Sequence, residues 1–225
     1  FVSILDGEFT MDTGAMLQNI KGNIDGSSVG VYIDAGSTMN MKAGAEIRNS
    51  ENIASNSYGA LVVSGTLNME GGSISGCKAD NGAGIAIVSG NAHMSGGSVN
   101  GNTSNRGGVL ILGGSLSLSG APDISGNKKA DNTTDCNVLF ISGSSIVVGA
   151  GGLTNTTPIG VTSFNAPSAG SPVNITAASN QDWSSYFTSD NASYVIQNSG
   201  SSSSQAVQLA VSSAINVGDS NGNNL

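Results

Sequence analysis

The sequence has little charge, few aromatic rings, one histidine and two cysteines. Of its 225 residues, 10% are charged and 4% are aromatic, and seven Lys and Arg against fifteen Asp and Glu give a net charge of −8. Nucleic-acid binding and attachment to anionic membranes both depend on clustered cations, so we exclude the first and disfavour the second. A metal centre built from His and Cys is excluded by the number of such ligands.

Long apolar runs and a disulfide framework are also missing. The apolar stretches are far shorter than the ~18 residues of a membrane span, so we expect no span in this chain. Cys77 and Cys136 fall in different turns of the repeat described below, beyond disulfide reach, and we expect two unpaired thiols. The chain begins inside a strand-like pattern without Met, and we interpret it as part of a longer exported protein that is extracellular or on the cell surface.

What is present is a repeat, clearest in residues 65–77. Its copies align on an apolar anchor at Met11, Met41, Met69, Met94, Leu118 and Val148, with separations of 30, 28, 25, 24 and 30 residues. A near-constant period with variable insertions is typical of a solenoid.

Within each copy the pattern alternates, as expected for a strand with one buried face. We expect the anchors to point inward together with the residues two positions earlier, Phe9, Met39, Leu67, Ala92, Leu116 and Ile146. The positions between them should point outward: Thr10, Asn40, Asn68, His93, Ser117 and Val147.

Two more apolar stacks complete each turn. One follows a Gly-rich bend, at Ile20, Ile47, Ile74, Val99, Ile124 and Leu153. The other precedes the unit, in residues 31–33, 60–62, 85–87, 109–111 and 139–141. Three short strands per turn predict an all-β fold, a parallel β-helix (solenoid) of about six to seven turns, right-handed because parallel crossovers have that hand.

A column of small polar residues is predicted at one bend, where stacked amides can form a hydrogen-bonded ladder. Its members are Asn23, Ser50, Cys77, Asn102 and Asn127.

The pattern Met-x-Gly-Gly-x-Ile-x-Gly-Asn, followed by Asn-Gly-x-Gly-Ile-x-Ile, occurs in residues 69–87, 94–111 and 118–127, with departures at Cys77 and Val99. It resembles the repeats of pectin-lyase-like β-helix domains in large bacterial surface proteins, over residues 4–155. The resemblance implies the fold, which hosts lyases, hydrolases, adhesins and stalks. The lyases of this fold use acidic clusters for calcium with an Arg or Lys base, and its glycosidases use Asp or Glu pairs.

We divide the chain into coils, residues 1–164, and a last coil with a C-terminal capping β segment, residues 165–225. Residues 194–196 and 205–211 should pair across a Ser-rich turn, residues 182–187 should form a short helix, and residues 218–225 should be disordered.

Ionisable residues give no catalytic, cofactor or metal site. His93 should be exposed, and the acidic residues Asp34, Asp80, Asp123, Asp131 and Asp135 fall mostly in bends. The loop from Asp131 to Asp135 could bind calcium, but we prefer the interpretation that it is a solvated acidic loop. Lys42 and Glu70 occupy equivalent positions in adjacent turns, which predicts a weak ion pair on the surface.

An apolar column is expected on the outside if Ile33 and its counterparts face inward: Tyr32, Leu61, Ala86, Leu110 and Phe140. Such a stripe is either covered by the C-terminal segment or an N-terminal neighbour, or is a contact face for self-association or a receptor.

Two functions are compatible with these patterns. The leading hypothesis is a non-catalytic secreted or cell-surface module, a stalk or adhesin with a polysaccharide or cell-surface partner. The alternative is a carbohydrate-active enzyme, a polysaccharide lyase or glycoside hydrolase. Two carboxylates about 5–10 Å apart in an outward groove would favour the enzyme.

Overall fold

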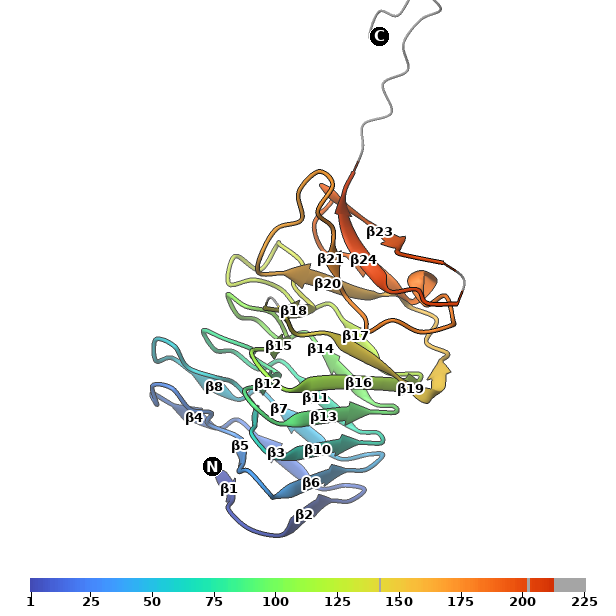
Figure 1. Cartoon of the computed structure of the whole chain (residues 1–225). Helices are drawn as coiled ribbons and strands as arrows, with labels where there is room; N and C mark the ends of the chain where they lie inside the picture. The colour runs from blue at the N-terminus through green and yellow to red at the C-terminus, as the bar shows by residue number, and fades with distance from the viewer. Residues whose placement is uncertain (142, 202, 213–225) are drawn as a thin grey trace, which may run out of the picture.

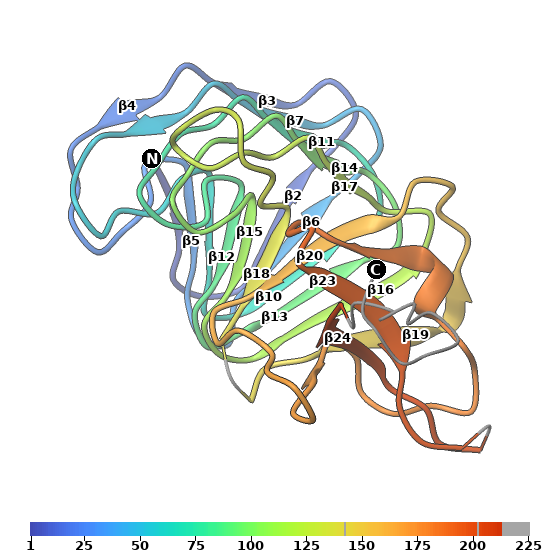
Figure 2. The same cartoon turned by 90° about the horizontal axis from the view of Figure 1, so that it is seen from above.

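The computed structural model describes residues 1–141, 143–201 and 203–212. The chain winds in coils that stack along one axis and whose strands form three large parallel sheets, with the N-terminal coil at one end and an antiparallel sheet at the other (Figure 1). Viewed along this axis, the three sheets surround a common interior (Figure 2). The prediction of a parallel β-solenoid is confirmed, with about seven turns. Its right-handedness stays a prediction.

Each of the first five coils contributes one strand to each of the three sheets, and the later coils contribute to one or two of them. The eight-stranded sheet contains β1 (Val2–Ile4), β5 (Val31–Ile33), β9 (Leu61–Val63), β12 (Ile85–Ile87), β15 (Val109–Ile111), β18 (Val138–Phe140), β20 (Ile159–Ser163) and β22 (Phe187–Ser189). The six-stranded sheet contains β2 (Glu8–Met11), β6 (Thr38–Met41), β10 (Thr66–Met69), β13 (Asn91–Met94), β16 (Ser115–Gly120) and β19 (Ile146–Leu153). The five-stranded sheet contains β3 (Met16–Gln18), β7 (Glu46–Arg48), β11 (Ser73–Ser75), β14 (Ser98–Asn100) and β17 (Asp123–Ser125).

The six-stranded sheet has the predicted register. Met41, Met69 and Met94 stack in one inward column and are fully buried, and Asn40, Asn68 and His93 stack in the outward column between the inward ones. The bend that leads into this sheet has no room for a side chain at Gly114. A Cβ on Gly114, where φ is +70°, would lie 1.8 Å from the carbonyl oxygen of Gly90 in the coil before.

Four register predictions are wrong. Leu17, and not Ile20, pairs with Ile47 in the five-stranded sheet, and Leu153 ends β19 opposite Gly120 after a register shift. In the eight-stranded sheet β9 is residues 61–63 and not 60–62, and β18 is residues 138–140 and not 139–141. Both of these segments are runs of four apolar residues, in which alternation cannot fix which residue points inward.

The two ends of the stack differ. At the C-terminal end β21 (Val173–Asn174), β24 (Val207–Val211) and β23 (Tyr194–Asn198) form the antiparallel sheet, in which β23 and β24 pair as predicted. Val207 and Leu209 from this sheet are buried in the core. At the N-terminal end Phe9 and Leu17 are only half-buried, whereas Met39 and Ile47, which stack on them, are fully buried.

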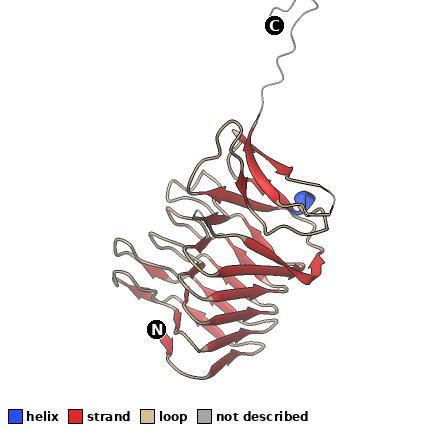
Figure 3. Ribbon diagram, in the orientation of Figure 1, coloured by secondary structure: helices blue, strands red, loops and turns tan. Residues whose placement is uncertain are grey.

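Helix is almost absent from the described part of the chain, as Figure 3 shows. The predicted short helix is the 3-10 helix η1 (Ser184–Tyr186). No helix among the described residues is long and apolar enough to span a membrane. The predicted disordered segment, residues 218–225, lies outside the described residues.

Candidate binding groove

The candidate site lies on the row of loops that connect the five-stranded sheet to the eight-stranded sheet. These loops project from one side of the stack, next to β4 (Lys21–Gly22) and β8 (Glu51–Asn52) in Figure 1. The predicted polar column lies where the loops begin. The prediction that Asn23 belongs to it is wrong: Lys21 pairs with Glu51, so the apolar Ile20 stacks on Ser50. The polar column consists of Ser50, Cys77, Asn102 and Asn127.

The part of the column from Cys77 to Asn127 forms the predicted hydrogen-bonded ladder, whereas the buried Ser50 hydroxyl has no hydrogen-bond partner among the described residues. The Oδ1 atom of Asn127 accepts hydrogen bonds from the backbone N–H and the side-chain amide of Asn102, at 3.1 and 3.0 Å. Asn127 donates in the same two ways to Oδ1 of Asn137, at 3.0 and 3.2 Å. Because Asn102 and Asn127 are fully buried and satisfied, the ladder fixes where each loop leaves the five-stranded sheet.

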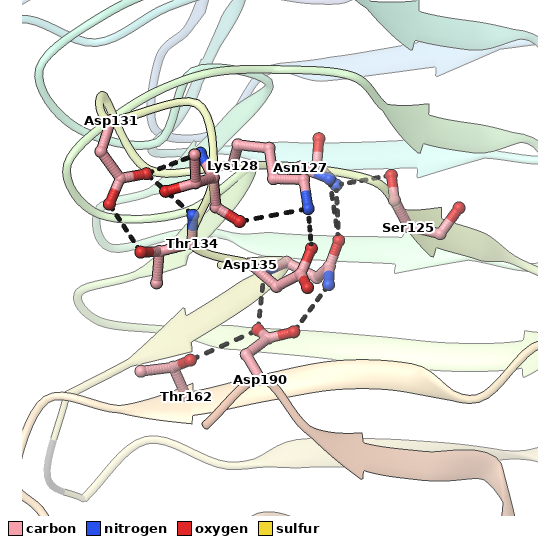
Figure 4. A network of polar contacts seen from close by, with 10 residues as sticks. Ser125, Asn127, Lys128, Asp131, Thr134, Asp135, Thr162 and Asp190 are labelled. Atoms are coloured by element: carbon pink, nitrogen blue, oxygen red, sulfur yellow. Dashed lines mark hydrogen bonds and ion pairs between the residues drawn. The ribbon is translucent and has the colours of Figure 1, made fainter. Parts of the chain in front are cut away.

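The ladder ends at a carboxylate, which the sequence analysis did not single out. Asp190 accepts hydrogen bonds from the backbone N–H and the side-chain amide of Asn137, both at 2.7 Å, and from the Thr162 hydroxyl at 3.3 Å (Figure 4). Burial raises the pKa of Asp190 above its ordinary value, against the opposing effect of these three donors. Asp190 follows β22, so it ties the last parallel strand to the loop before β18.

The loop of residues 128–135 is held by its own side chains (Figure 4). Asp131 accepts hydrogen bonds from the backbone N–H groups of Thr133 and Thr134, both at 2.8 Å, and from the Thr134 hydroxyl at 2.6 Å. These donors lower the pKa of Asp131, the Thr134 hydroxyl most strongly. Lys128 and Asp135 pair at 2.6 Å across the base of the loop. The loop is therefore ordered before any ligand arrives.

A groove of about 420 Å³ lies over the loop bases and crosses four coils. Parallel bridges align three side chains along it, those of Glu51, Lys78 and Thr103. One side is lined by residues that follow β8, including Ile53, and Asn132 lines it from the 128–135 loop. The groove is thus an open, mixed polar and apolar surface that runs along the solenoid axis, of a size that suits a small ligand or a segment of a chain molecule.

The acidic residues of the groove are already engaged by the protein. Glu51 pairs with Lys21 at 3.4 Å. Asp80 accepts the backbone N–H of Asn56 at 2.9 Å and the side-chain amide of Asn105 at 2.7 Å, so it links the loops of three successive coils. These contacts make the carboxylates structural elements of the groove wall.

A smaller cavity of about 260 Å³ lies at the C-terminal end of the loop row. Asp135 and Asp190 both line it, together with Lys129, Thr162 and Asn191. The negative charge of Asp135 contributes to the raised pKa of Asp190. Two carboxyl groups in different environments, one partly buried and one exposed, are thereby brought to one cavity from distant parts of the sequence.

The predicted apolar stripe is not one column. Ala86 and Leu110 face out from the eight-stranded sheet with Tyr32, but Leu61 and Phe140 belong to the inward column, because β9 and β18 are shifted by one residue. The outward column contains Tyr32, Val62, Ala86, Leu110 and Leu139.

This outward column is covered by the loops of the coils themselves. Leu110, Cys136 and Leu139 form a small buried cluster against which Tyr58 packs. Only Tyr32 of the five predicted stripe residues is partly exposed, and the other four are buried. The predicted cover by the C-terminal segment or by an N-terminal neighbour is therefore wrong, because the loops between the strands cover the column.

The remaining predictions concern single residues. His93 is exposed, as expected from its outward position. Cys77 and Cys136 are buried free thiols, and burial raises the pKa of each to about 11, which suppresses thiolate chemistry. Within residues 1–141, 143–201 and 203–212, no three His, Cys, Asp or Glu side chains are grouped so that they could hold a metal ion.

Three of the groove residues, Glu51, Lys78 and Thr103, could have been found in the sequence. Each of them directly follows a predicted member of the polar column, so the column predicts that they stack. No such signal exists for Asp190, which meets Asn137 across 53 residues of chain.

Fold and groove together define a parallel β-solenoid with an open groove along its axis. No protein-family model matches the chain, and the searches of curated proteins and of solved structures find no significant match.

Proposed function

We propose that the chain is a non-catalytic, secreted or cell-surface module of the pectin-lyase-like β-helix type, which acts as an adhesin and binds polysaccharide along its groove. The observation that carries the proposal is the groove itself, which crosses four coils and has a preformed loop at one end. A ligand that runs along the axis meets a new coil every ~4.8 Å, so a repeating chain molecule matches the repeating surface.

The chemistry of the groove also favours a polysaccharide. Hydroxyl-rich ligands need hydrogen-bonding side chains beside apolar contact area, and the groove offers Thr103, Ser55 and Asn132 next to Ile53 and alanines. The repeat resemblance described above supports export and a place at the cell surface.

A carbohydrate-active enzyme is the second candidate, favoured by one observation. Asp135 and Asp190 share the smaller cavity, and the pKa of Asp190 is raised, as an acid–base pair would require. Asp190 is also the acceptor at the end of the ladder, however, and its three hydrogen bonds give it a structural role that explains its burial.

The test is a screen of the purified protein against a panel of polysaccharides and host glycans, followed both by binding and by depolymerisation, with and without calcium. We expect binding without depolymerisation. Cleavage that is lost in Asp190→Asn and Asp135→Asn would replace the adhesin with the enzyme, and the absence of both binding and cleavage would leave a structural stalk.

A further inference from the structure

Lys78 is the one cation among the described residues that lines the groove, and no side chain of the described part of the chain pairs with it. Lys21 pairs with Glu51, and Lys128 pairs with Asp135. Among the residues that the structure describes, the exposed ammonium group of Lys78 forms neither an ion pair nor a hydrogen bond, although it lies between Glu51 and Thr103 in the aligned row. An unpaired cation flanked by ordered side chains is available to an anionic group of a ligand.

The carboxylates near Lys78 do not remove this availability. Asp80 is held by the backbone N–H of Asn56 and the amide of Asn105. Glu51 pairs with Lys21, which lies in the preceding coil, whereas Lys78 lies in the following coil. Both acidic groups thus have donors of their own, and neither of them occupies the ammonium group of Lys78. Their negative charges remain in the groove, so an anion gains affinity here only through a direct contact with Lys78.

The surroundings of Lys78 specify the rest of the ligand. The Thr103 hydroxyl, one coil further on, and the Asn132 side chain have no hydrogen-bond partner among the described residues. Ile53, which is 72% exposed, and Ala79 add apolar surface beside them. Free hydrogen-bonding groups next to small apolar patches match the hydroxyls and the C–H faces of sugar rings.

We propose that Lys78 is the anion-binding subsite of the groove and that the ligand is an acidic glycan, with a carboxylated or sulfated sugar residue at Lys78 and neighbouring residues along Thr103 toward Asn132. This inference rests on the proposed polysaccharide-binding function and sharpens its ligand class. The net charge of −8 disfavours unspecific attraction of polyanions, so binding of an acidic glycan must arise from a local site.

Three oligosaccharide probes of similar length test the subsite: alginate, which is carboxylated, dextran sulfate, which is sulfated, and neutral dextran. Affinity is measured by isothermal titration calorimetry for the wild type, Lys78→Met and Lys78→Arg. Lys42→Met is the control, because Lys42 is a partly exposed lysine directly after β6, outside the groove, where it pairs with Glu70.

We expect at least one acidic probe to bind the wild type and dextran to bind much more weakly. Lys78→Met should lower the affinity about tenfold or more, as the loss of a charge-assisted hydrogen bond predicts. Lys78→Arg should retain most of the affinity, and Lys42→Met should change it less than about twofold. The affinity of the wild type should also fall with added salt, more steeply than that of Lys78→Met.

Each other outcome overturns the inference in a distinguishable way. Equal binding of dextran and acidic probes, unchanged in Lys78→Met, would reject the subsite and leave the polysaccharide-binding function intact. Equal losses in Lys78→Met and Lys42→Met would show a diffuse charge effect in place of a site. Failure of all three probes, together with a panel that contains no ligand, would reject both the subsite and the proposed function.

Discussion

The eight-stranded and the six-stranded sheets are built from the same coils, yet their outer faces have opposite chemistry. In β9, β12 and β15 all three residues are buried, whereas β6, β10 and β13 alternate between fully buried and more exposed residues. A sheet that is buried on both faces has continuous apolar strands, and a sheet with one wet face has alternating ones. The two sheets therefore show, within one molecule, how the cover of a sheet determines its sequence pattern.

The cover of the eight-stranded sheet consists of the loops that precede its strands. They approach so closely that a Cβ on Gly82 would lie 2.9 Å from the Cβ of Leu110. Tyr58 and Cys136 from other loops contact the same column. An apolar column that faces away from a solenoid core is thus no sign of a partner protein when the loops at its bend are long enough to fold back over it.

Replacing Leu110 by Ala should have the largest effect. Leu110 is fully buried outside the main core, and its truncation leaves a cavity beneath the loops, so the free energy of unfolding should fall by about 2–4 kcal/mol. Ser117→Ala, on the outer face of the six-stranded sheet, should cost less than about 0.5 kcal/mol.

The measurement is urea unfolding followed by circular dichroism for both variants. Equal small losses for Leu110→Ala and Ser117→Ala would mean that the column is open to solvent, and the comparison of the two sheets would fail. Since a solenoid can unfold in segments, unfolding is followed at two wavelengths, and coincident transitions justify a two-state free energy.

The same contrast explains how much of the fold could be predicted. Alternation between polar and apolar residues set the register of the six-stranded sheet, in which Met41, Met69 and Met94 stack as expected. Around Leu61 and Phe140 every neighbour is apolar, and a one-residue slip leaves the pattern unchanged. Residues 85–88 and 109–112 are apolar runs of the same length, so the register was equally undetermined there, and the errors fell on two of four ambiguous coils.

The candidate site was less predictable than the fold, because it depends on loops. The polar column at Asn102 and Asn127 was visible as a repeat, and the stacking of Lys78 on Glu51 follows from it. The lack of a partner for Lys78 and the approach of Asp190 to Asn137 depend on loop conformations that have no period. The sequence repeat reveals the structure that all coils share, whereas the groove depends on the loops in which the coils differ.

The covered side of the eight-stranded sheet ends in a carboxyl group, so its stability should depend on pH. Burial raises the pKa of Asp190 in the native state above the 3.8 of a free Asp side chain. The native state therefore binds a proton more tightly than the unfolded chain does. The contribution of Asp190 to stability should increase as the pH falls through the native pKa, and should be complete below 3.8.

Comparison of the wild type with Asp190→Asn over the range from about pH 7 to pH 3 isolates this contribution. The matched control is Asp131→Asn, because its hydrogen bonds lower the pKa of Asp131 below 3.8. The contribution of Asp131 is present above 3.8 and is lost on acidification, so the two differences should change in opposite directions. A flat difference for Asp190→Asn would contradict the effect of burial.

The smallest effect is expected where the six-stranded sheet turns and its side chains are solvated. Lys42 and Glu70, in adjacent coils, pair at 2.6 Å with side chains that are 37% and 56% exposed. In a double-mutant cycle of Lys42→Met and Glu70→Gln, the coupling energy should be below about 0.5 kcal/mol and should vanish in high salt. A coupling above about 1 kcal/mol would mean that this bend behaves as a covered site. The difference between the two sheets would then lie in their side chains alone, and not in their exposure to water.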